Sequence, residues 1–367
     1  MIDPRNLPEM PALAIVGPCE LHDEDLEVLG RQVIAHYGDT WVQIHRQVLD
    51  DLATLLGAAE SPYLIPGSGT TCLDAAMLNL FEPGQKVLVA DTGFFGQRLA
   101  QIATQQGLAV EVLPVEVGAP VEAGAVAERA RGCDGVLAVH VETSTGVRHP
   151  IEQIAAAARE AGALCVIDGI ASVGGEFAEV DAWGIDALVT STQKGLETPP
   201  GLGIVALGPR GRKRVEARSS RPASWYLDLH TWDWYRREWA SWHPHPVTMP
   251  TPLVLVLASS LRRILAHGFP AWVEARAALA SRLRTGLSDL GFEHVAREGA
   301  GSNLVVAVHA EDAGEILAHV LRQGIQLSGG LPPLAGASLR IGLLGKAASE
   351  QMVDRVVDAI ARARKET

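Results

Sequence analysis

Cysteine is scarce in this 367-residue sequence, and its spacing excludes several kinds of site. The thiols lie far apart, and no two of them form a Cys-x-x-Cys pair; they are Cys19, Cys72, Cys133 and Cys165. Closely spaced cysteines would indicate a zinc site or a redox-active dithiol. We therefore expect neither a metal site nor thiol redox chemistry.

Long apolar runs and a leader-like N-terminus are missing as well. Residues 1–9 contain acids and prolines without an apolar centre, unlike a secretory signal peptide. No apolar run approaches the length that spans a bilayer. The sequence therefore predicts a cytoplasmic protein without a membrane partner.

Positive charge is also in deficit, since 31 Lys and Arg stand against 43 Asp and Glu and leave a net charge of −12. Nucleic acid binding requires a basic face that neutralises phosphates. The one basic cluster, between Arg210 and Arg221, is typical of a solvated helix face. No nucleic acid partner is therefore expected.

The rest of the composition, 47% hydrophobic and 20% charged, is that of a globular protein too long for one core. Short apolar segments alternate with amphipathic helical patterns, which predicts an α/β fold with a mostly parallel central sheet and helices on both faces. Strands are expected over residues 86–90, 110–114, 135–140, 163–168, 187–190 and 203–207. Helices are expected over residues 73–80, 97–106 and 151–161.

The C-terminal part follows a different pattern. Residues 219–252 are rich in Trp, Pro and His, and we expect an ordered segment without repetitive structure. A long helical pattern over 253–290 precedes a strand-helix-strand-strand-helix unit over 303–365. We therefore divide the chain into an N-terminal arm (1–12), a large α/β domain (13–267) and a small α+β domain (268–367).

Lys194 and Asp168 each follow an apolar strand-like segment and are 26 residues apart. Ligands of α/β sheets bind at the carboxyl ends of the strands, so the two side chains can face one pocket. A lysine can form a Schiff base with an aldehyde cofactor, and an aspartate can keep a pyridine nitrogen protonated. A surface lysine and a turn aspartate are the structural alternatives.

A phosphate-binding loop is indicated by Pro-Gly-Ser-Gly-Thr-Thr over residues 66–71, directly before a helix. Gly69 lets the backbone approach an anion closely, while helix amides and the hydroxyls of Ser68 and Thr70 can bind it. A tight loop with a capped helix is the alternative interpretation. The loop lacks the Gly-Lys-Ser/Thr of a P-loop.

Three more residues suit a planar ligand that carries an anionic group. Phe95, flanked by glycines after a strand, can stack on a ring or fill the core. Thr143 offers a hydroxyl at a strand end, where it either binds a ring substituent or belongs to a turn. Arg340, within an apolar strand, can clamp a carboxylate or form an internal salt bridge.

In this order, the motifs resemble the class V, fold-type I, aminotransferases that depend on pyridoxal 5'-phosphate (PLP). The alanine–glyoxylate and serine–pyruvate group is the most similar, and the resemblance runs from about residue 17 to residue 356. Its most specific pieces are Ser-Thr-Gly-Val at 144–147, Asp168 with Ala-Ser-Val-Gly-Gly at 171–175, Ser-x-Gln-Lys at 191–194, Pro-Pro-Gly at 199–201, and Arg-Ile-Gly-Leu-Leu-Gly at 340–345.

The resemblance implies a role for each site residue. Lys194 would form the Schiff base and move the substrate proton, while Asp168 would bind the pyridine nitrogen. Phe95 would stack on the ring, and Thr143 would contact its hydroxyl region. The residues that would hold the phosphate are Ser68, Gly69, Thr70 and Gln193.

The resemblance also implies a substrate pocket and a second subunit. Arg340 would clamp the substrate carboxylate, and Gly17 would line the same pocket. Thr248, in a Thr-x-Pro segment, and His245 would reach the phosphate of a neighbouring subunit. The protein is thus expected to be a homodimer with shared active sites.

The implied reaction is ping-pong transfer of an amino group from a small amino acid, of the alanine or serine type, to the 2-oxo acids glyoxylate or pyruvate. Departures from the family pattern at residues 19–20, 36–39, Thr70 and Gly169 leave the natural substrate open. The alternatives are a ureidoglycine–glyoxylate or aminophosphonate aminotransferase, a PLP lyase, or a non-catalytic binding protein. A cysteine desulfurase is disfavoured, because no cysteine follows Cys165.

Overall fold

A seven-stranded sheet forms the centre of the large domain, with the strand order β2-β10-β9-β8-β5-β3-β4. The structure is a computed structural model that describes residues 10–366, so residues 1–9 of the predicted arm lie outside it. Six strands are parallel, and β10 is antiparallel to both of its neighbours. The strands are β2 (Tyr63–Pro66), β3 (Lys86–Asp91), β4 (Ala109–Pro114), β5 (Gly135–Val139), β8 (Leu164–Asp168), β9 (Ala187–Ser191) and β10 (Leu202–Leu207).

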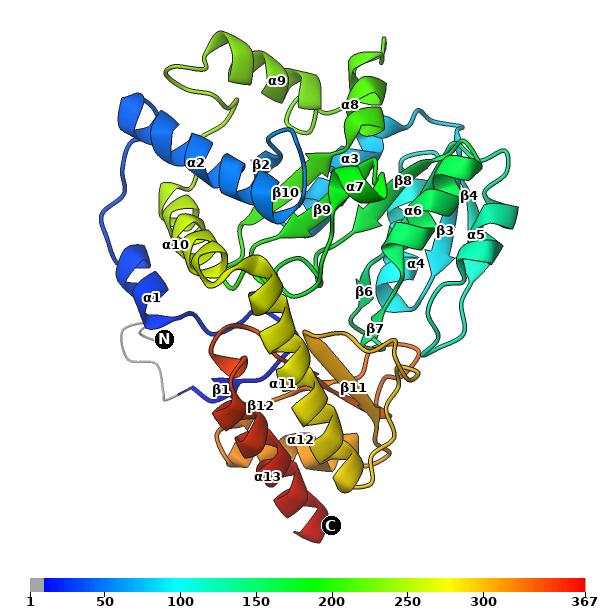
Figure 1. Ribbon diagram of the computed structural model, residues 1–367, viewed down its shortest axis with the longest axis vertical. Helices are drawn as coiled ribbons and strands as arrows, with labels where there is room; N and C mark the ends of the chain where they lie inside the picture. The colour runs from blue at the N-terminus through cyan, green and yellow to red at the C-terminus, as the bar shows by residue number, and fades with distance from the viewer. Residues whose placement is uncertain (1–9, 367) are drawn as a thin grey trace, which may run out of the picture.

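Helices cover both faces of this sheet, as Figure 1 shows. Successive side chains of a strand point to opposite faces, so Leu88 of β3 joins one core and Val89 joins the other. One face carries α2 (Asp39–Leu55), α5 (Ala123–Arg129), α6 (Ile151–Glu160), α7 (Val180–Trp183) and α10 (Thr251–His267). The other carries α3 (Gly69–Leu80), α4 (Phe94–Gln105), α8 (Pro209–Glu216) and α9 (Leu229–Glu238). The predicted α/β class with a mostly parallel sheet is confirmed.

The small domain has its own sheet and its own core. An antiparallel sheet joins β11 (Val305–His309), β14 (Ser338–Gly342) and β13 (Ser328–Gly329), in that order. It packs with α12 (Ala313–Arg322), α13 (Glu350–Glu366) and part of α11 (Phe269–Asp289), which reaches down from the large domain in Figure 1.

The start of the described chain pairs with this small domain. β1 (Ala12–Leu13) lies parallel to β12 (Ile325–Gln326), and Ala14 is part of the small-domain core. The predicted division at residues 12 and 13 separates two residues that share one strand. The remaining short elements are α1 (Asp23–Leu29), β6 (Val141–Glu142), β7 (Val147–Arg148) and a 3-10 turn at Gly345–Ala347.

Two predicted segments differ from the structure. The helical pattern expected over 253–290 is two helices, because α10 and α11 meet at a 90° bend. Gly268 lies at the bend with φ +85°, a left-handed conformation that glycine adopts without strain. The segment 219–252, expected to have no repetitive structure, contains α9.

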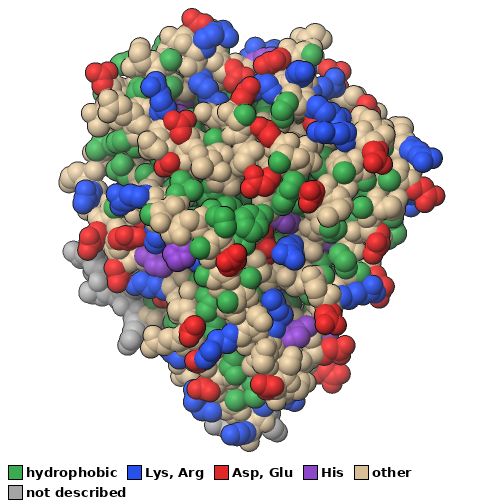
Figure 2. Space-filling view, in the orientation of Figure 1, with side chains coloured by type: hydrophobic (Ala, Val, Ile, Leu, Met, Phe, Trp, Pro, Cys, Tyr) green, Lys and Arg blue, Asp and Glu red, His purple; other side chains and the backbone are tan. Residues whose placement is uncertain are grey.

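The surface is mixed in charge, and acidic and basic side chains alternate over the face in Figure 2. Among the described residues, no single helix is long and apolar enough to cross a membrane. The α10–α11 pair meets the length and composition criteria only when both helices are taken together across their bend.

Candidate active site

A cavity of about 230 Å³ opens at the carboxyl ends of the central strands. Asp168 ends β8, and Lys194 lies three residues after β9, so neighbouring parallel strands bring both side chains to this cavity. Eight of the predicted site residues line it together: Ser68, Gly69, Thr70, Phe95, Thr143, Asp168, Gln193 and Lys194.

Lys194 is held in an environment that disfavours its charged form. Burial, and next the nearby Arg340 guanidinium, lower the pKa of Lys194 to about 8. Its Nζ donates a hydrogen bond to the carbonyl oxygen of Val16. A Cβ at Gly17 would lie 2.6 Å from Lys194 Cδ, so a larger residue here would force the lysine side chain to shift. Gly17 thus contacts the lysine, although it does not line the cavity itself.

Asp168 is a carboxylate with only 4% of its surface exposed. Burial raises its pKa to about 7, and this effect exceeds the stabilisation from the Ile170 amide, which donates to Oδ1 at 2.9 Å. The negative charge of Glu142 adds to the rise. A cation placed beside this group would favour its ionised form.

The loop before α3 caps the helix, which is one of the two interpretations that its sequence left open. Ser68 is the N-cap of α3, and its Oγ accepts from the Thr71 amide at 3.2 Å in a capping box. The first amides of the helix point to the same end, where an anion is favoured. A Cβ at Gly69 would lie 2.5 Å from Ile170 Cδ1, so the glycine permits a close approach of the loop to the strand ends.

Phe95 lies in the first turn of α4, and Arg98 lies one turn later on the same side. The guanidinium carbon of Arg98 is 4.8 Å from the centre of the Phe95 ring, and both residues line the cavity. The positive charge of Arg98 also favours ionised Asp168. Arg98 was not recognised in the sequence, although its spacing of three residues from Phe95 is a usable signal.

Arg340 enters from the small domain and lies beyond Thr143. Its Nε donates to the carbonyl of Gly329 at 2.7 Å, and its Nη1 donates to the carbonyl of Thr143 at 3.2 Å. Within residues 10–366, no ion pair joins it to an acid. Arg340 does not line the cavity, but its charge acts on Lys194. The small domain therefore contributes a buried cation next to the lysine.

His245 and Thr248 lie outside the cavity of this chain. His245 is fully buried; its Nε2 accepts from Trp41 Nε1, and its Nδ1 bonds the Val247 carbonyl, both at 2.8 Å. Burial lowers the pKa of His245 to about 3. Thr248 is exposed. A contact of either residue with a phosphate therefore needs a neighbouring subunit, and this role stays a prediction.

The same histidine belongs to a cluster with His36 and His243, whose ligand atoms lie within 4.8 Å of one another. His36 Nδ1 and His243 Nε2 are 3.1 Å apart. The acceptor lone pair of His245 is occupied by Trp41, so this ring has none free for a metal in the observed geometry. We therefore assign no metal to this cluster.

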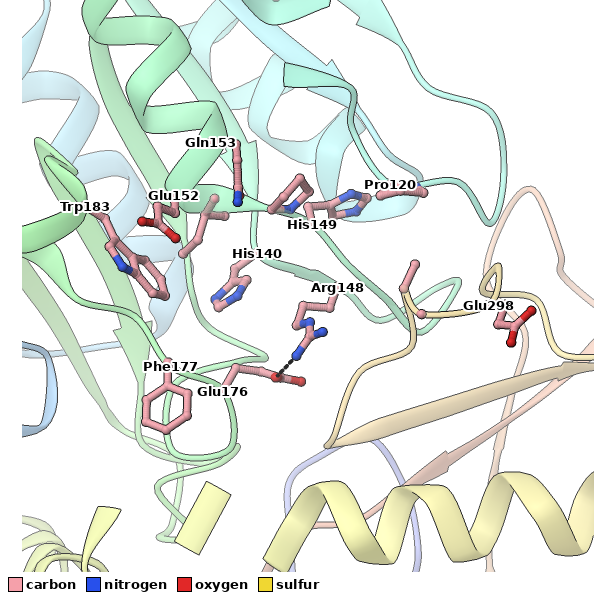
Figure 3. Close-up of a pocket in the computed structure, with 14 residues that line it drawn as sticks. Pro120, His140, Arg148, His149, Glu152, Gln153, Glu176, Phe177, Trp183 and Glu298 are labelled. Carbon is pink, nitrogen blue, oxygen red and sulfur yellow. Dashed lines mark hydrogen bonds and ion pairs between the residues drawn. The ribbon is translucent and has the colours of Figure 1, made fainter. Parts of the chain in front are cut away.

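A larger cavity, of about 630 Å³, is drawn in Figure 3. It lies between α6, α7 and the small-domain residues 298–300, and neither Lys194 nor Asp168 lines it. His140 faces it with 3% exposure, and burial lowers the pKa of this histidine to about 3. Arg148 pairs with Glu176 at 3.3 Å on its wall, as the dashed line in Figure 3 marks. The absence of any lysine from this cavity separates it from Schiff-base chemistry.

Comparison with known proteins gives four consistent findings. The family model for class V aminotransferases matches residues 24–355. The L-aspartate–glyoxylate aminotransferase of Paracoccus denitrificans is 32% identical over 90% of this chain and 85% of its own length. The alanine–glyoxylate aminotransferase of Oryctolagus cuniculus is 28% identical over 95% and 91%. The crystal structure of ureidoglycine–glyoxylate aminotransferase from Bacillus subtilis has a TM-score of 0.93 at 26% identity, and it covers 98% of this chain and 94% of that one.

Proposed function

Because the chain belongs to the class V aminotransferase family and is a PLP-dependent transaminase, we propose that it moves an amino group from a small amino acid to glyoxylate or pyruvate. The observation that carries this proposal is the convergence of Lys194 and Asp168 on one cavity, with Arg340 beyond Thr143. The three named relatives share glyoxylate and differ in the other substrate, which favours glyoxylate as the acceptor.

The groups around the cavity fit PLP. Thr143 Oγ1 and Gln193 Oε1 are buried and, among the described residues, have no hydrogen-bond partner. Buried polar atoms without partners are rare and point to a polar ligand. The start of α3 would hold the phosphate, Phe95 would stack on the ring, and Asp168 would face the ring nitrogen.

When bound, PLP supplies an aldehyde carbon for amine attachment and a ring that takes up electrons from the substrate Cα. With a pKa of about 8, roughly a tenth of Lys194 is the free amine at pH 7. This side chain can therefore attach the cofactor and then move the proton at the substrate Cα. The Asp168 carboxylate would accept a hydrogen bond from the protonated ring nitrogen, and Arg340 would bind the substrate carboxylate with its planar fork.

The direct test is the half-reaction. Purified protein is loaded with PLP, and candidate donors are added one at a time without an acceptor: alanine, serine, aspartate and ureidoglycine. We expect the visible absorption band of the bound aldehyde form to disappear with one small donor and to return with glyoxylate or pyruvate. We expect a ping-pong order, in which the product of the donor leaves before the acceptor binds. Double-reciprocal plots of initial rate against donor concentration, at several acceptor concentrations, should then give parallel lines.

Borohydride reduction then locates the attachment point. The chain has only five lysines, so peptide mapping distinguishes them readily. We expect the adduct at Lys194 and its loss in Lys194→Ala, whereas Lys346→Ala, a change at a surface residue paired with Asp23, should keep it. A protein that binds no PLP, or that is reduced at another lysine, would refute the proposed site.

The proposal includes a homodimer with shared sites. It is supported by exposed Thr248 and by exposed apolar side chains on neighbouring segments: Val33, Tyr37, Trp239 and Trp242. Mixing Lys194→Ala with Thr248→Ala subunits should restore one complete site per hybrid dimer and hence recover activity. A mixture without recovered activity, or a monomer by light scattering, would contradict the homodimer.

We also propose a cytoplasmic location, because all four cysteines are free and buried.

A further inference from the structure

Glu142 is a buried carboxylate directly behind the wall of the Lys194 cavity. It is 0% exposed and does not line the cavity. It accepts five hydrogen bonds, and every partner is a donor from the loops around the site. The neighbouring hydroxyl of Thr143 was identified as a candidate from the sequence, and Glu142 was not.

The two oxygens of Glu142 bind different segments. Oε2 accepts from the amides of Phe95 at 2.9 Å and Gly96 at 3.1 Å, and from Thr92 Oγ1 at 3.3 Å. Oε1 accepts from the amide of Ser144 at 3.0 Å and from its hydroxyl at 2.7 Å. One side chain thus joins the start of α4 to the loop that contains Thr143.

This arrangement caps α4 from a distant part of the chain. The residue at the N-cap position is Gly93, which has no side chain, so the first amides of α4 need other acceptors. Glu142 supplies two of these contacts, and Ser144 Oγ accepts from the Phe94 amide at 3.3 Å. A negative charge at this position also interacts favourably with the helix dipole.

Glycine at position 93 is required for the close approach. Gly93 has φ +138°, and a Cβ there would lie 2.5 Å from Ser144 Oγ and 3.1 Å from Glu142 Cγ. A Cβ at Gly96 would lie 2.7 Å from the carbonyl of Ala90. The Gly-Phe-Phe-Gly segment therefore fits the carboxylate closely, and this contact fixes where Phe95 lies.

We propose that Glu142 is the positioning residue of the cofactor ring site: its carboxylate holds Phe95 and Thr143 at their places on the cavity wall. The inference rests on the proposed cofactor site. Phe95 is held through its own amide, and Thr143 is held between Glu142 and Ser144, both of which are fixed by the same carboxylate. Arg340 then bonds the Thr143 carbonyl, so the substrate-binding cation depends on the same loop.

Glu142 also influences the charges of the site. Its negative charge favours protonated Asp168 and protonated Arg340. In the proposed function, Asp168 faces the ring nitrogen and Arg340 faces the substrate carboxylate. Replacing this charge therefore changes more than packing. A purely structural hydrogen-bond acceptor would leave the titration of the bound cofactor unchanged.

The test is Glu142→Gln, which keeps the shape and removes the charge. An amide has one acceptor oxygen, so its NH₂ group must face amides or a hydroxyl that donate. The matched control is Glu176→Gln, a second buried carboxylate that accepts from the Asn303 amide at 2.6 Å and lies on the other cavity. Both variants remove a buried charge with strong hydrogen bonds, and only one is connected to the ring site.

Four quantities are measured: the PLP dissociation constant of the apoprotein, visible circular dichroism of the bound cofactor, the pH at which its absorption changes, and the apoprotein melting temperature. In Glu142→Gln we expect PLP affinity to fall about tenfold or more, because charge-assisted hydrogen bonds are lost, together with a weaker dichroic band and a shifted titration. In Glu176→Gln we expect only a lower melting temperature.

The outcomes separate this inference from the proposed function. If the wild-type protein forms no adduct at Lys194, the proposed function fails. If the adduct forms, two results refute the positioning role. One is that Glu142→Gln binds PLP within twofold of the wild-type affinity, and the other is that Glu176→Gln loses as much PLP affinity as Glu142→Gln. Should Glu142→Gln not fold, Ser144→Ala removes the hydroxyl that donates to Oε1 and accepts from the Phe94 amide, and its effect on affinity and dichroism decides in the same way.

Discussion

Replacement of Lys194 by methionine should stabilise the apoprotein, and by an amount that depends on pH. Burial lowers the pKa of this lysine from 10.5 to about 8, so folding penalises its charged form. At about 1.4 kcal/mol for each tenfold change in proton affinity, the penalty is about 3 kcal/mol at pH 7. Methionine has a similar length and no charge, and therefore avoids this penalty.

The sign of the pH dependence follows from proton binding. Between pH 8 and 10.5 the unfolded chain binds more protons at this lysine than the folded chain, so wild-type stability rises with pH in this range. Lys194→Met has no such group. The stability advantage of the variant should fall from about 3 kcal/mol at pH 7 to about 1 kcal/mol at pH 10.

Urea unfolding of both PLP-free proteins between pH 7 and pH 10 measures this difference. The variant also loses the hydrogen bond to the Val16 carbonyl, which shifts the whole curve by a constant and does not affect its slope. Lys213→Met, a change at an exposed residue of α8, supplies the baseline for losing one lysine. A difference between wild type and Lys194→Met that stays constant over this pH range would refute the assignment of a desolvated lysine.

Three further changes test the rest of the site. Asp168→Asn removes a carboxylate whose pKa burial raises to about 7. The free-energy cost of this carboxylate to folding is present above pH 7 and disappears as the pH falls toward 3.8. The PLP-free variant should therefore be a few kcal/mol more stable than wild type at pH 8 by urea unfolding, while its kcat falls by about 10²-fold or more. Equal stability of the two proteins at pH 8 would contradict this account. Arg340→Lys should raise the KM for the amino donor by roughly 10- to 100-fold in steady-state kinetics, because lysine lacks the planar fork, and should leave the cofactor absorption band unchanged. Gly17→Ala places a Cβ 2.6 Å from Lys194 Cδ at a backbone φ of +100°. The rate of PLP attachment, measured by stopped-flow absorbance, should therefore fall, and the free energy of unfolding should fall by about 1–3 kcal/mol. An unaffected attachment rate would show that the lysine has room to move.

Six of the seven strands of the large sheet, all except β2, were predicted to within one residue at each end. The central strands β5, β8, β9 and β10 are buried along most of their length. Such strands appear in a sequence as short continuous apolar runs, and polar residues mark where they end. The run that ends at Asp168 coincides with the end of β8, and the run before Lys194 extends only one residue further in β9. The same contrast between an apolar run and a following polar residue identified both functional side chains.

Features that depend on long-range geometry were not accessible in the same way. The reversed direction of β10 follows from its pairing with β2 and β9, and an apolar run has no direction. The bend between α10 and α11 lies at Gly268, and Pro270 follows in the first turn of α11. Gly followed by Pro is a helix-boundary signal, so this break was present in the sequence and was missed, whereas the angle between the helices was not present there.

The predicted and the missed site residues differ for a related reason. The proposed phosphate loop, Asp168 and Lys194 are recognisable because each combines a local motif with a chemical requirement. Glu142 acts on amides 46 and 47 residues earlier in the chain, and nothing in its own neighbourhood indicates that contact. Residues that position others are found only when the fold brings the segments together.

In the apoprotein the proposed site is costly to the fold, because it buries a carboxylate, a lysine and polar atoms that have no partners among the described residues. Asp168 is forced toward its neutral form and Lys194 toward its free amine, while Thr143 Oγ1 and Gln193 Oε1 are buried without partners among the described residues. A cofactor with a protonated ring nitrogen, a ring hydroxyl and a phosphate would relieve these costs at once. Binding energy is then larger than the new contacts alone provide, because the empty site starts from a higher free energy. The same groups that weaken the cofactor-free protein are therefore the ones that we propose bind this cofactor.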